Sequence, residues 1–253
     1  MRASLFAAAA LAACLSVSSL AAGIPAAVSA AVADSARPAA DTARDAGRKP
    51  AETLAFIGIK PGAQIAELLP GGGYFTRLLS VLAGPKGHVY ALTPPPRPNA
   101  PAGAPDPAAA VSAIAADAHY GNISVAPLAA GAPALGLSQP VDVIWTSDNY
   151  HDLHNQPNAD LAGFNKHVFE ALKSGGLYIV IDHAAATGHG AGDTRTLHRI
   201  DVETVKAEVT AAGFKLAGSS DVLHNAQDPH TAPIFDASIR GNTDQFILKF
   251  VKP

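Results

Sequence analysis

Residues Ile65 to Thr76 read IAELLPGGGYFT. A short apolar run ends in the carboxylate of Glu67, and three consecutive glycines, Gly71, Gly72 and Gly73, precede a second apolar segment. This order predicts a strand, a glycine-rich turn and a helix. Glycine lets the backbone come close to a ligand, and the N–H groups that open a helix carry partial positive charge. The stretch therefore indicates a ligand-binding turn, with a tight turn that holds no ligand as the alternative.

The N-terminus has the features of an export signal. Met1-Arg2 gives a positive start, residues 5–20 form an apolar run rich in alanine, and small residues near Ala30 fit a cleavage site. We therefore expect residues 1–30 to be a signal peptide and the protein to be periplasmic or secreted. The residues before Cys14 resemble a lipoprotein processing box, so a lipid anchor at Cys14 is a second, less favoured interpretation.

The charge, the cysteine content and the lengths of the apolar stretches limit the kinds of partner and site that the chain can have. The chain of 253 residues has a formal net charge of -3 and 15% charged residues, which provides no basic face for nucleic acid. Cys14 is the only cysteine, so a mature chain cleaved beyond it has no disulfide, thiolate metal site or cysteine nucleophile. No other stretch approaches the roughly 20 apolar residues that a membrane span needs. We expect a small-molecule partner, no nucleic acid and no membrane span, and the sequence leaves the oligomeric state undefined.

The remainder of the chain divides into a short arm and one domain. Residues 31–50 are polar, rich in alanine and broken by Pro38, which predicts a loosely packed N-terminal arm. Strands are expected at residues 65–67, 88–92, 123–126, 141–146, 177–181, 216–219 and 246–251, and helices at residues 50–57, 76–82, 108–120, 160–172 and 202–212. Within residues 51–253 this alternation predicts an α/β domain built as a three-layer α/β/α sandwich. Residues 93–107 are dense in proline and are expected to form a surface excursion.

Polar side chains follow the fourth and fifth expected strands. After the fourth come Asp148, Asn149, Tyr150, His151, Asp152 and His154, and after the fifth come Asp182 and His183. The carboxyl ends of parallel strands share one edge of a sheet, so these side chains should face the same crevice as Glu67. Imidazole titrates near neutral pH, which makes His151 and His183 candidates for a general base.

The order of elements and motifs resembles the class I S-adenosylmethionine-dependent methyltransferases. More narrowly, it is similar to a group of predicted exported methyltransferases. The shared succession runs from Arg48-Lys49-Pro50 through residues 71–76 to Asn149–Leu153 and Asp182-His183, and the resemblance covers about Arg44 to Pro253. It implies a Rossmann-like sheet of seven strands whose last strand is antiparallel to the others. It also implies methyl transfer from S-adenosylmethionine to an unidentified small molecule.

The resemblance assigns roles to particular residues. It implies a cofactor site made of Glu67, Gly71, Gly72, Gly73, Thr93 and Asp148, with Glu67 and the glycines at the methionine end. It implies that Asn149 and Tyr150 contact the acceptor nucleophile or the methyl donor; as further catalytic residues we expect His151 and His183, because they should lie at the same strand ends. The chain departs from the family pattern at three positions, one of them Pro127-Leu128-Ala129, which supplies no polar or acidic residue near the adenine. Leu69 stands where the first glycine is usual, and Thr93 stands where a carboxylate usually binds the ribose hydroxyls.

The same residues leave a second class of function open. His151 and His154 could form a nitrogen and oxygen metal site suited to zinc, manganese or iron. Further ligands for such a site are Asp152, Asp182 and His183, with His198, Asp201, His224 and His230 available from the C-terminal part. The alternative function is thus a periplasmic ligand-binding or metal-dependent protein that kept the fold and lost the cofactor. An oxidoreductase is disfavoured, because the glycines do not follow the Gly-x-Gly-x-x-Gly spacing.

Four other residues have structural interpretations. Trp145, the only tryptophan, lies in an apolar strand and is expected in the core. Arg195 and Arg199 precede the helix expected at residues 202–212 and are expected on a solvated surface. Asp201 directly precedes the same helix and is expected to be its N-cap.

Overall fold

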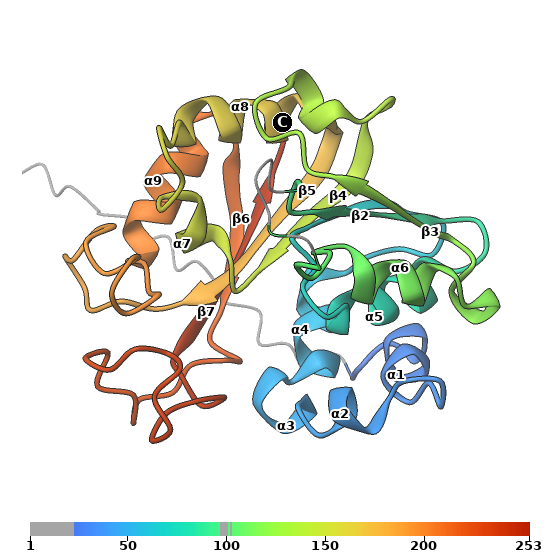
Figure 1. Cartoon of the computed structure of the whole chain (residues 1–253), viewed down its shortest axis with the longest axis horizontal. Coiled ribbons are helices and arrows are strands. Elements are labelled where there is room, and N and C mark those ends of the chain that lie inside the picture. Colours follow the sequence, from blue (N-terminus) through green and yellow to red (C-terminus); the bar gives the residue numbers. More distant parts are fainter. Residues whose placement is uncertain (1–22, 97–100, 102) are drawn as a thin grey trace, which may run out of the picture.

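The computed structural model describes residues 23–96, 101 and 103–253, which form a mixed sheet between two layers of helices (Figure 1). Within these residues the sheet has seven strands in the order β3-β2-β1-β4-β5-β7-β6. The strands are β1 Gln64–Leu68, β2 His88–Thr93, β3 Ile123–Pro127, β4 Val141–Ser147, β5 Leu172–His183, β6 Lys215–Ser220 and β7 Gln245–Val251. β7 pairs antiparallel with β5 and β6, and the other neighbouring pairs are parallel. The three-layer fold and its antiparallel last strand are therefore confirmed.

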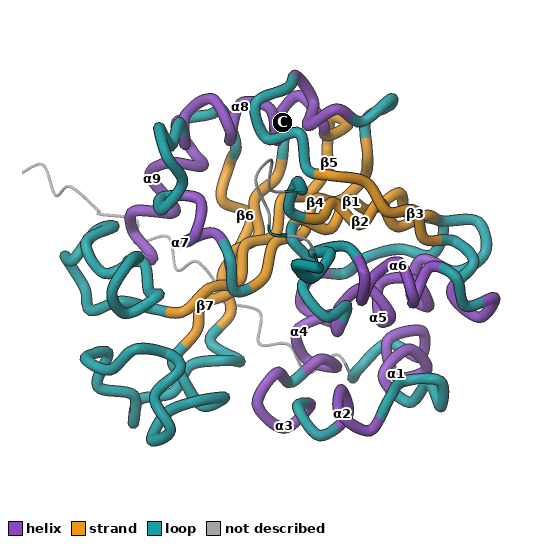
Figure 2. Tube along the Cα trace, in the orientation of Figure 1, coloured by secondary structure: helices purple, strands orange, loops and turns teal. Residues whose placement is uncertain are grey.

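The helices lie on both faces of the sheet (Figure 2). They are α1 Ala26–Val32, α2 Ala39–Thr42, α3 Asp45–Arg48, α4 Pro50–Ile57, α5 Tyr74–Ala83, α6 Ala109–Ala115, α7 Tyr150–Leu153, α8 Leu161–Ala171 and α9 Val202–Ala211, with 3-10 turns η1 Ala118–Tyr120 and η2 Pro133–Gly136. One layer contains α1, α4, α5 and α6, and the other contains α8 and α9. No helix in the part of the chain that the structure describes is long and apolar enough to cross a membrane.

The central strands bury both of their faces, because consecutive residues of a strand point to opposite sides. In β4, Val143 and Trp145 pack into the core cluster of α4 and α5, whereas Ile144 packs into the cluster of α8 and α9. β5 repeats the pattern with Ile179 on the first side and Val180 on the second. Trp145 is fully buried, which confirms its expected place in the core.

The strand order has one switch point, and it lies between β1 and β4. From β1 the chain builds outward through β2 to β3, and from β4 it builds outward in the opposite direction to β5. Open α/β sheets bind ligands at such a point, outside the carboxyl ends of the strands. The loop that follows β1 is the glycine-rich turn, and the segment that follows β4 starts at Asp148. The two motifs that the sequence singled out therefore meet at this switch point.

The expectation of a loosely packed arm over residues 31–50 is wrong. Val28 and Ala31 of α1 belong to the core cluster that contains α5, and α2 and α3 follow directly. The guanidinium of Arg37 is buried and donates two hydrogen bonds to the carboxylate of Asp45, with distances of 2.6 and 2.9 Å. That carboxylate also accepts a hydrogen bond of 2.6 Å from the hydroxyl of Tyr74, the first residue of α5. A partly buried ion pair thus ties the N-terminal segment to the helix behind the glycine-rich turn.

The helix expected at residues 108–120 and the position expected for Arg199 also differ in the structure, and some expectations concern residues that the structure does not describe. The helix expected at residues 108–120 is split, because the Asp117 side chain accepts a hydrogen bond from the N–H of His119 and starts a separate 3-10 turn. Arg199 is fully buried and not at a solvated surface, whereas Asp201 caps α9 as expected. Residues 1–22, which contain Cys14 and most of the predicted signal peptide, lie outside the described residues, as do residues 97–100 and 102 of the expected surface excursion.

Candidate active site

A cavity of about 220 Å³, here called the glycine-loop chamber, lies at the switch point. Its walls come from the loop after β1, the start of α5, the end of β4 and the segment of α3. The lining residues are Arg44, Arg48, Glu67, Leu68, Leu69, Pro70, Gly71, Gly72, Tyr74, Phe75, Ser147, Asp148 and Asn149. The chamber therefore joins the glycine-rich turn to the polar segment after β4, as the strand-end rule predicts.

The three glycines have different roles in this loop. Gly71 has a φ of +57°, and a Cβ on Gly71 or Gly72 would meet no described atom within 4 Å, so both present open backbone to the chamber. Gly73 has a φ of +80°, does not line the chamber, and a Cβ there would collide with Cδ1 of Ile114 in α6. Gly71 and Gly72 are thus placed for a ligand, whereas Gly73 is required by packing.

Alanine at these glycines should separate packing from ligand access. Gly73→Ala is expected to lower the free energy of unfolding by about 3 kcal/mol, because overpacking adds to the cost of a positive φ. Gly72→Ala is the matched control, with no positive φ and no close neighbour, and should change the free energy of unfolding by less than ~0.5 kcal/mol. Urea unfolding of the two variants checks this pair. An equal loss of unfolding free energy in both variants would contradict the conclusion that packing requires glycine at Gly73 but not at Gly72.

Leu69 holds an unusual backbone conformation at the position where the family resemblance expects glycine. Its φ is +52°, in the left-handed region that a branched side chain rarely adopts. Its N–H donates to the carbonyl of Leu92 at 2.8 Å, and its carbonyl accepts from Nδ2 of Asn149 at 3.1 Å. These two bonds fix the loop to β2 on one side and to the segment after β4 on the other. The structure thus keeps the glycine-like conformation with leucine in place of glycine.

Asn149 braces the chamber. Its Nδ2 donates to the carbonyl oxygens of Leu69 and Ser147, and to that of Leu68 at 3.3 Å, while its Oδ1 accepts from the hydroxyl of Thr146. Both polar atoms of its side chain are therefore engaged within the protein. Asn149 lines the chamber, but these bonds make it a residue that joins the loops after β1 and β4.

Glu67 places a buried carboxyl at the base of the chamber. Only 3% of the residue is exposed, and burial raises the pKa of Glu67 to about 8, against the opposing effects of a hydrogen bond from Thr76 and the charge of Arg48. The hydroxyl of Thr76 donates to Oε2 of Glu67 at 2.6 Å. At neutral pH the carboxyl is mostly protonated. A cation in the chamber would favour its ionised form.

Other charged and polar groups surround this carboxyl. Arg48 forms an ion pair of 2.6 Å with Asp148, and its guanidinium carbon lies 4.9 Å from the centre of the Tyr74 ring. Arg44 lies 5.1 Å from the same ring and forms no ion pair with the described residues. The hydroxyl of Ser147 is buried and finds no hydrogen-bond partner among the described residues. The chamber thus offers a free cation, a buried carboxyl and an unsatisfied hydroxyl.

A second cavity of about 770 Å³, here called the histidine chamber, adjoins the first. Arg44, Arg48 and Asp148 line both. The other lining residues are Ala43, Ala46, Gly47, His151, Asp152, His183, His198, Ile234, Phe235, Arg240, Gly241, Asn242, Thr243 and Gln245. The Arg48–Asp148 ion pair is therefore part of the wall of both chambers. The backbone of Asp148 is in the left-handed region, with a φ of +60°.

His151 is the most firmly held side chain of the histidine chamber. Its Nδ1 lies 2.7 Å from Oδ1 of Asp182, and its backbone N–H donates to Oδ2 of Asp182 at 2.7 Å. Asp182 is fully buried and also accepts from the N–H of His183 at 2.8 Å, so it acts as an acceptor and Nδ1 of His151 carries the proton. Burial opposes protonation of His151, but the charges of Asp182, Asp152 and Asp148 outweigh it and raise the pKa of the imidazole.

His183 has the opposite electrostatic character. It is largely buried, and burial lowers the pKa of its imidazole despite the charges of Asp148 and Asp182. Its Nδ1 lies 2.7 Å from the hydroxyl of Thr243, and its Nε2 lies 3.9 Å from Oδ1 of Asp148. At neutral pH His183 is therefore an uncharged imidazole at the wall of the chamber, which is the form that accepts a proton.

Three residues assigned to the site from the sequence lie elsewhere. Tyr150 is fully buried, and its hydroxyl donates to Oε2 of Glu208 at 2.8 Å on the far side of α7. His154 contacts the same oxygen at 3.2 Å, so it does not join His151. Thr93 is buried at the end of β2, where its hydroxyl bonds to the carbonyl of Ala126 at 3.3 Å, and it lines neither chamber. The structure does not bring these three side chains to the cavities.

Sequence reasoning missed several residues that line the chambers. Arg44 and Arg48 come from the segment that was expected to be loosely packed, and Ser147 directly follows the strand expected at residues 141–146 but received no role. Arg48 begins the Arg-Lys-Pro motif that the chain shares with the exported methyltransferases, and this motif was the sequence signal that could have placed Arg48 in the site. Phe235 lies in the loop between β6 and β7, and no pattern in the sequence connects it to the strand ends.

Comparisons with known proteins agree with the fold. No protein-family model and no curated protein matches the chain. An S-adenosylmethionine-dependent methyltransferase from Aquifex aeolicus is similar in structure, with a TM-score of 0.55 and 15% identity over 80% of this chain and 88% of that chain.

Two further solved structures are similar in the same way. Aeropyrum pernix fibrillarin, solved with natively bound S-adenosyl-L-methionine, has a TM-score of 0.51 and 19% identity over 82% of this chain and 76% of that chain. A possible exported protein from Bordetella parapertussis has a TM-score of 0.50 and 15% identity over 84% of this chain and 67% of that chain. The chain therefore has the Rossmann-like fold of the S-adenosylmethionine-dependent methyltransferases.

Proposed function

We propose that the protein transfers a methyl group from S-adenosylmethionine to a small molecule bound in the histidine chamber. The observation that carries this proposal is the glycine-loop chamber itself. It lies at the switch point of a methyltransferase fold, where it holds the buried carboxyl of Glu67 beside the open backbone of Gly71 and Gly72. A larger cavity adjoins it, so donor and acceptor would meet at the Arg48–Asp148 wall.

The residues present fit the charged amino-acid end of this cofactor. Arg44, free of ion pairs with the described residues, would bind the cofactor carboxylate, since guanidinium and carboxylate match in charge and geometry. Glu67 and the unsatisfied hydroxyl of Ser147 would bind its ammonium group. The cofactor, when bound, supplies a methyl group activated by a positively charged sulfur. At the ribose end Thr93 offers no carboxylate and does not line the chamber, so affinity must come mainly from the amino-acid end.

A residue in the wall of the histidine chamber could also deprotonate the acceptor. His183, uncharged at neutral pH and held by Thr243, would accept the proton that an oxygen or nitrogen nucleophile loses on methylation. Such general-base assistance contributes about 10²- to 10⁴-fold in rate. Methyl transfer at an undiminished rate by a His183→Gln protein would remove this role.

Glu67→Gln should weaken binding of S-adenosylmethionine by about 10- to 100-fold at pH 8.5, because one charge-assisted hydrogen bond is lost. Isothermal titration calorimetry with S-adenosylmethionine and S-adenosylhomocysteine measures the effect. Glu52→Gln is the matched control, because Glu52 lies exposed on α4 and should leave affinity unchanged.

The absence of a heat signal with either ligand, in a wild-type protein shown to be folded, would reject the cofactor. The result would favour the second candidate function, a periplasmic ligand-binding or metal-dependent protein on the same fold. The observation in favour of that candidate is Thr93, whose side chain leaves the expected ribose contact without a carboxylate.

We also propose that the protein is exported. Residues 1–22 carry the features of a signal peptide, and Val28 and Ala31 of α1 pack into the core. Cleavage ahead of Ala26 would keep α1 intact, whereas cleavage at Ala30 would remove Val28 from that core. The mass of the mature chain recovered from the periplasmic fraction distinguishes these sites, and a chain that retains Met1 would contradict export by cleavage.

A further inference from the structure

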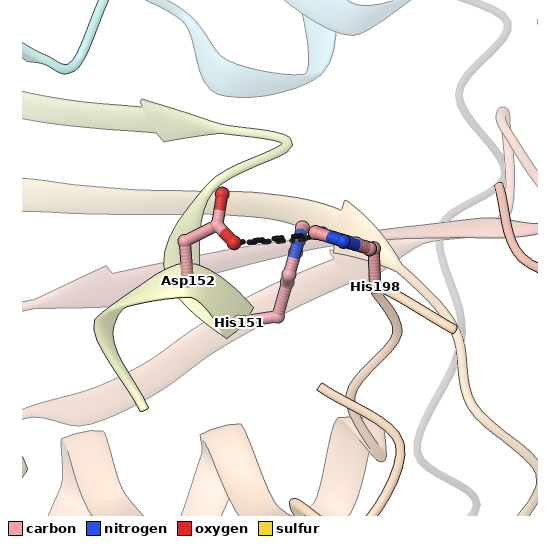
Figure 3. Close-up of side chains that lie close together, drawn as sticks. All are labelled: His151, Asp152 and His198. Atoms are coloured by element: carbon pink, nitrogen blue, oxygen red, sulfur yellow. Dashed lines mark hydrogen bonds and ion pairs between the residues drawn. The ribbon is translucent and has the colours of Figure 1, made fainter. Parts of the chain in front are cut away.

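Three potential metal ligands converge in the histidine chamber (Figure 3). His151 and Asp152 are neighbours in α7, and His198 comes from the loop before α9. Nε2 of His151 lies 3.3 Å from Nδ1 of His198 and 3.4 Å from Oδ1 of Asp152, and the remaining pair, Nδ1 of His198 and Oδ1 of Asp152, is 3.5 Å apart. The three atoms form a nearly equilateral triangle.

The size of this triangle is compatible with tetrahedral coordination. With metal–ligand bonds of about 2.0–2.1 Å, tetrahedral ligands lie about 3.3–3.4 Å apart. Adjacent octahedral ligands at the same bond length lie only about 2.8–3.0 Å apart. The observed separations of 3.3, 3.4 and 3.5 Å match the tetrahedral value. Two imidazole nitrogens and one carboxylate oxygen are also a ligand set that zinc adopts when its fourth position is open.

Neighbouring side chains fix the orientation of the two histidine ligands. The hydrogen bond to Asp182 places a proton of His151 on Nδ1, so Nε2, which is directed at His198 and Asp152, is the atom that binds a metal once the ring is neutral. A carboxylate behind a histidine is the usual outer support of a metal-bound imidazole. His198 keeps a φ of +55°, and its ring packs against Phe235 with the ring centres 4.9 Å apart. A strained backbone and a fixed ring together aim Nδ1 at the other two ligands.

We propose that His151, Asp152 and His198 bind one divalent cation of the zinc type, with Asp182 as the outer support of His151. The fourth position faces the histidine chamber and takes water or a donor atom of the small molecule bound there. His154, which the sequence suggested as the second histidine, is replaced in this site by His198. The site stands independently of methyl transfer, because it uses none of the residues that would hold S-adenosylmethionine.

The test is titration of the chelator-treated, full-length protein with Zn²⁺ against a competing chromophoric chelator. Wild type should bind one equivalent, and Co²⁺ in its place should show the visible absorption of a tetrahedral site. His198→Ala and Asp152→Asn should each weaken binding by at least ~100-fold. Both side chains are partly exposed, at 31% and 43%, so the variants should fold. His189→Ala is the matched control, an exposed histidine that also contacts an aspartate.

Two outcomes would overturn the metal site. One is failure of the folded wild-type protein to take up a stoichiometric amount of Zn²⁺ or Co²⁺. That result would show that hydrogen bonds, without a metal ion, account for the short separations of the three side chains. The other is an affinity in His198→Ala and Asp152→Asn equal to that of His189→Ala, which would place the ion elsewhere. Zinc uptake without any response to S-adenosylmethionine would reject the proposed methyl transfer and leave the metal site standing.

Discussion

Arg199→Ala is expected to reduce the free energy of unfolding by about 3–5 kcal/mol, because it leaves a buried carboxylate without its partner. Arg199 and Asp228 are both fully buried at their side chains and share two hydrogen bonds of 2.8 and 3.1 Å. The same guanidinium donates to the carbonyl oxygens of Ala184 at 3.0 Å and Ala232 at 3.1 Å. It therefore anchors the loop between β6 and β7 to the end of β5. That loop forms a wall of the histidine chamber.

Equilibrium unfolding in urea measures this loss. Arg195→Ala is the matched control, since Arg195 is exposed and its side chain donates one hydrogen bond among the described residues, of 3.5 Å to the carbonyl of Asn155. The control should change the free energy of unfolding by less than ~0.5 kcal/mol. A loss of under ~1 kcal/mol for Arg199→Ala would show that the loop does not depend on the ion pair. Binding of Zn²⁺ by this variant should also weaken, because Phe235 of the loop packs on His198.

Glu67→Gln is expected to remove a dependence of stability on pH. Burial raises the pKa of Glu67 to about 8, from 4.5 for an exposed carboxyl. A raised pKa favours folding fully below pH ~4.5, and the contribution is lost as pH rises through ~8. Each pKa unit corresponds to about 1.4 kcal/mol, so the change over this window is on the order of 5 kcal/mol. Glutamine cannot ionise, so the variant should lack this decline.

Urea unfolding at a series of pH values between 4.5 and 9 compares the two proteins. Near pH 4.5 their free energies of unfolding should be similar, and above pH 8 the variant should be the more stable. The wild-type curve should recover on addition of a cationic ligand that favours the ionised carboxyl. Parallel curves for wild type and Glu67→Gln across the whole range would mean that Glu67 is ionised in the folded protein.

Local patterns were sufficient to predict the sheet and most helices. The strands alternate apolar residues that meet helices on both sides, and glycine-rich turns separate them, so each element is visible within its own segment. The N-terminal segment gave no such signal. Its order depends on the ion pair between Arg37 and Asp45 and on a hydrogen bond from Tyr74, and Tyr74 lies 29 residues beyond Asp45 in the sequence. Contacts of this kind have no local periodicity.

The candidate site was predictable where it depends on strand ends. Glu67, Asp148, His151 and His183 meet because parallel strands end at one edge of the sheet. Tyr150 lines neither chamber, because the residues after β4 form a helical turn. On a helix, residues four apart share a face, so Tyr150 and His154 point together toward Glu208 of α9, while His151 points into the chamber. His198 was named only as one of several distant histidines, since it lies 47 residues from His151.

The wall of the histidine chamber joins two distant parts of the chain. Gly47 of α3 lies so close to the C-terminal loop that a Cβ there would come within 2.7 Å of the carbonyl of Gly241. The glycine-loop chamber needs only residues 44–149, whereas the histidine chamber needs the chain as far as Gln245. Closing the histidine chamber therefore requires contact between segments that lie far apart in the sequence, so its wall is expected to form late in folding.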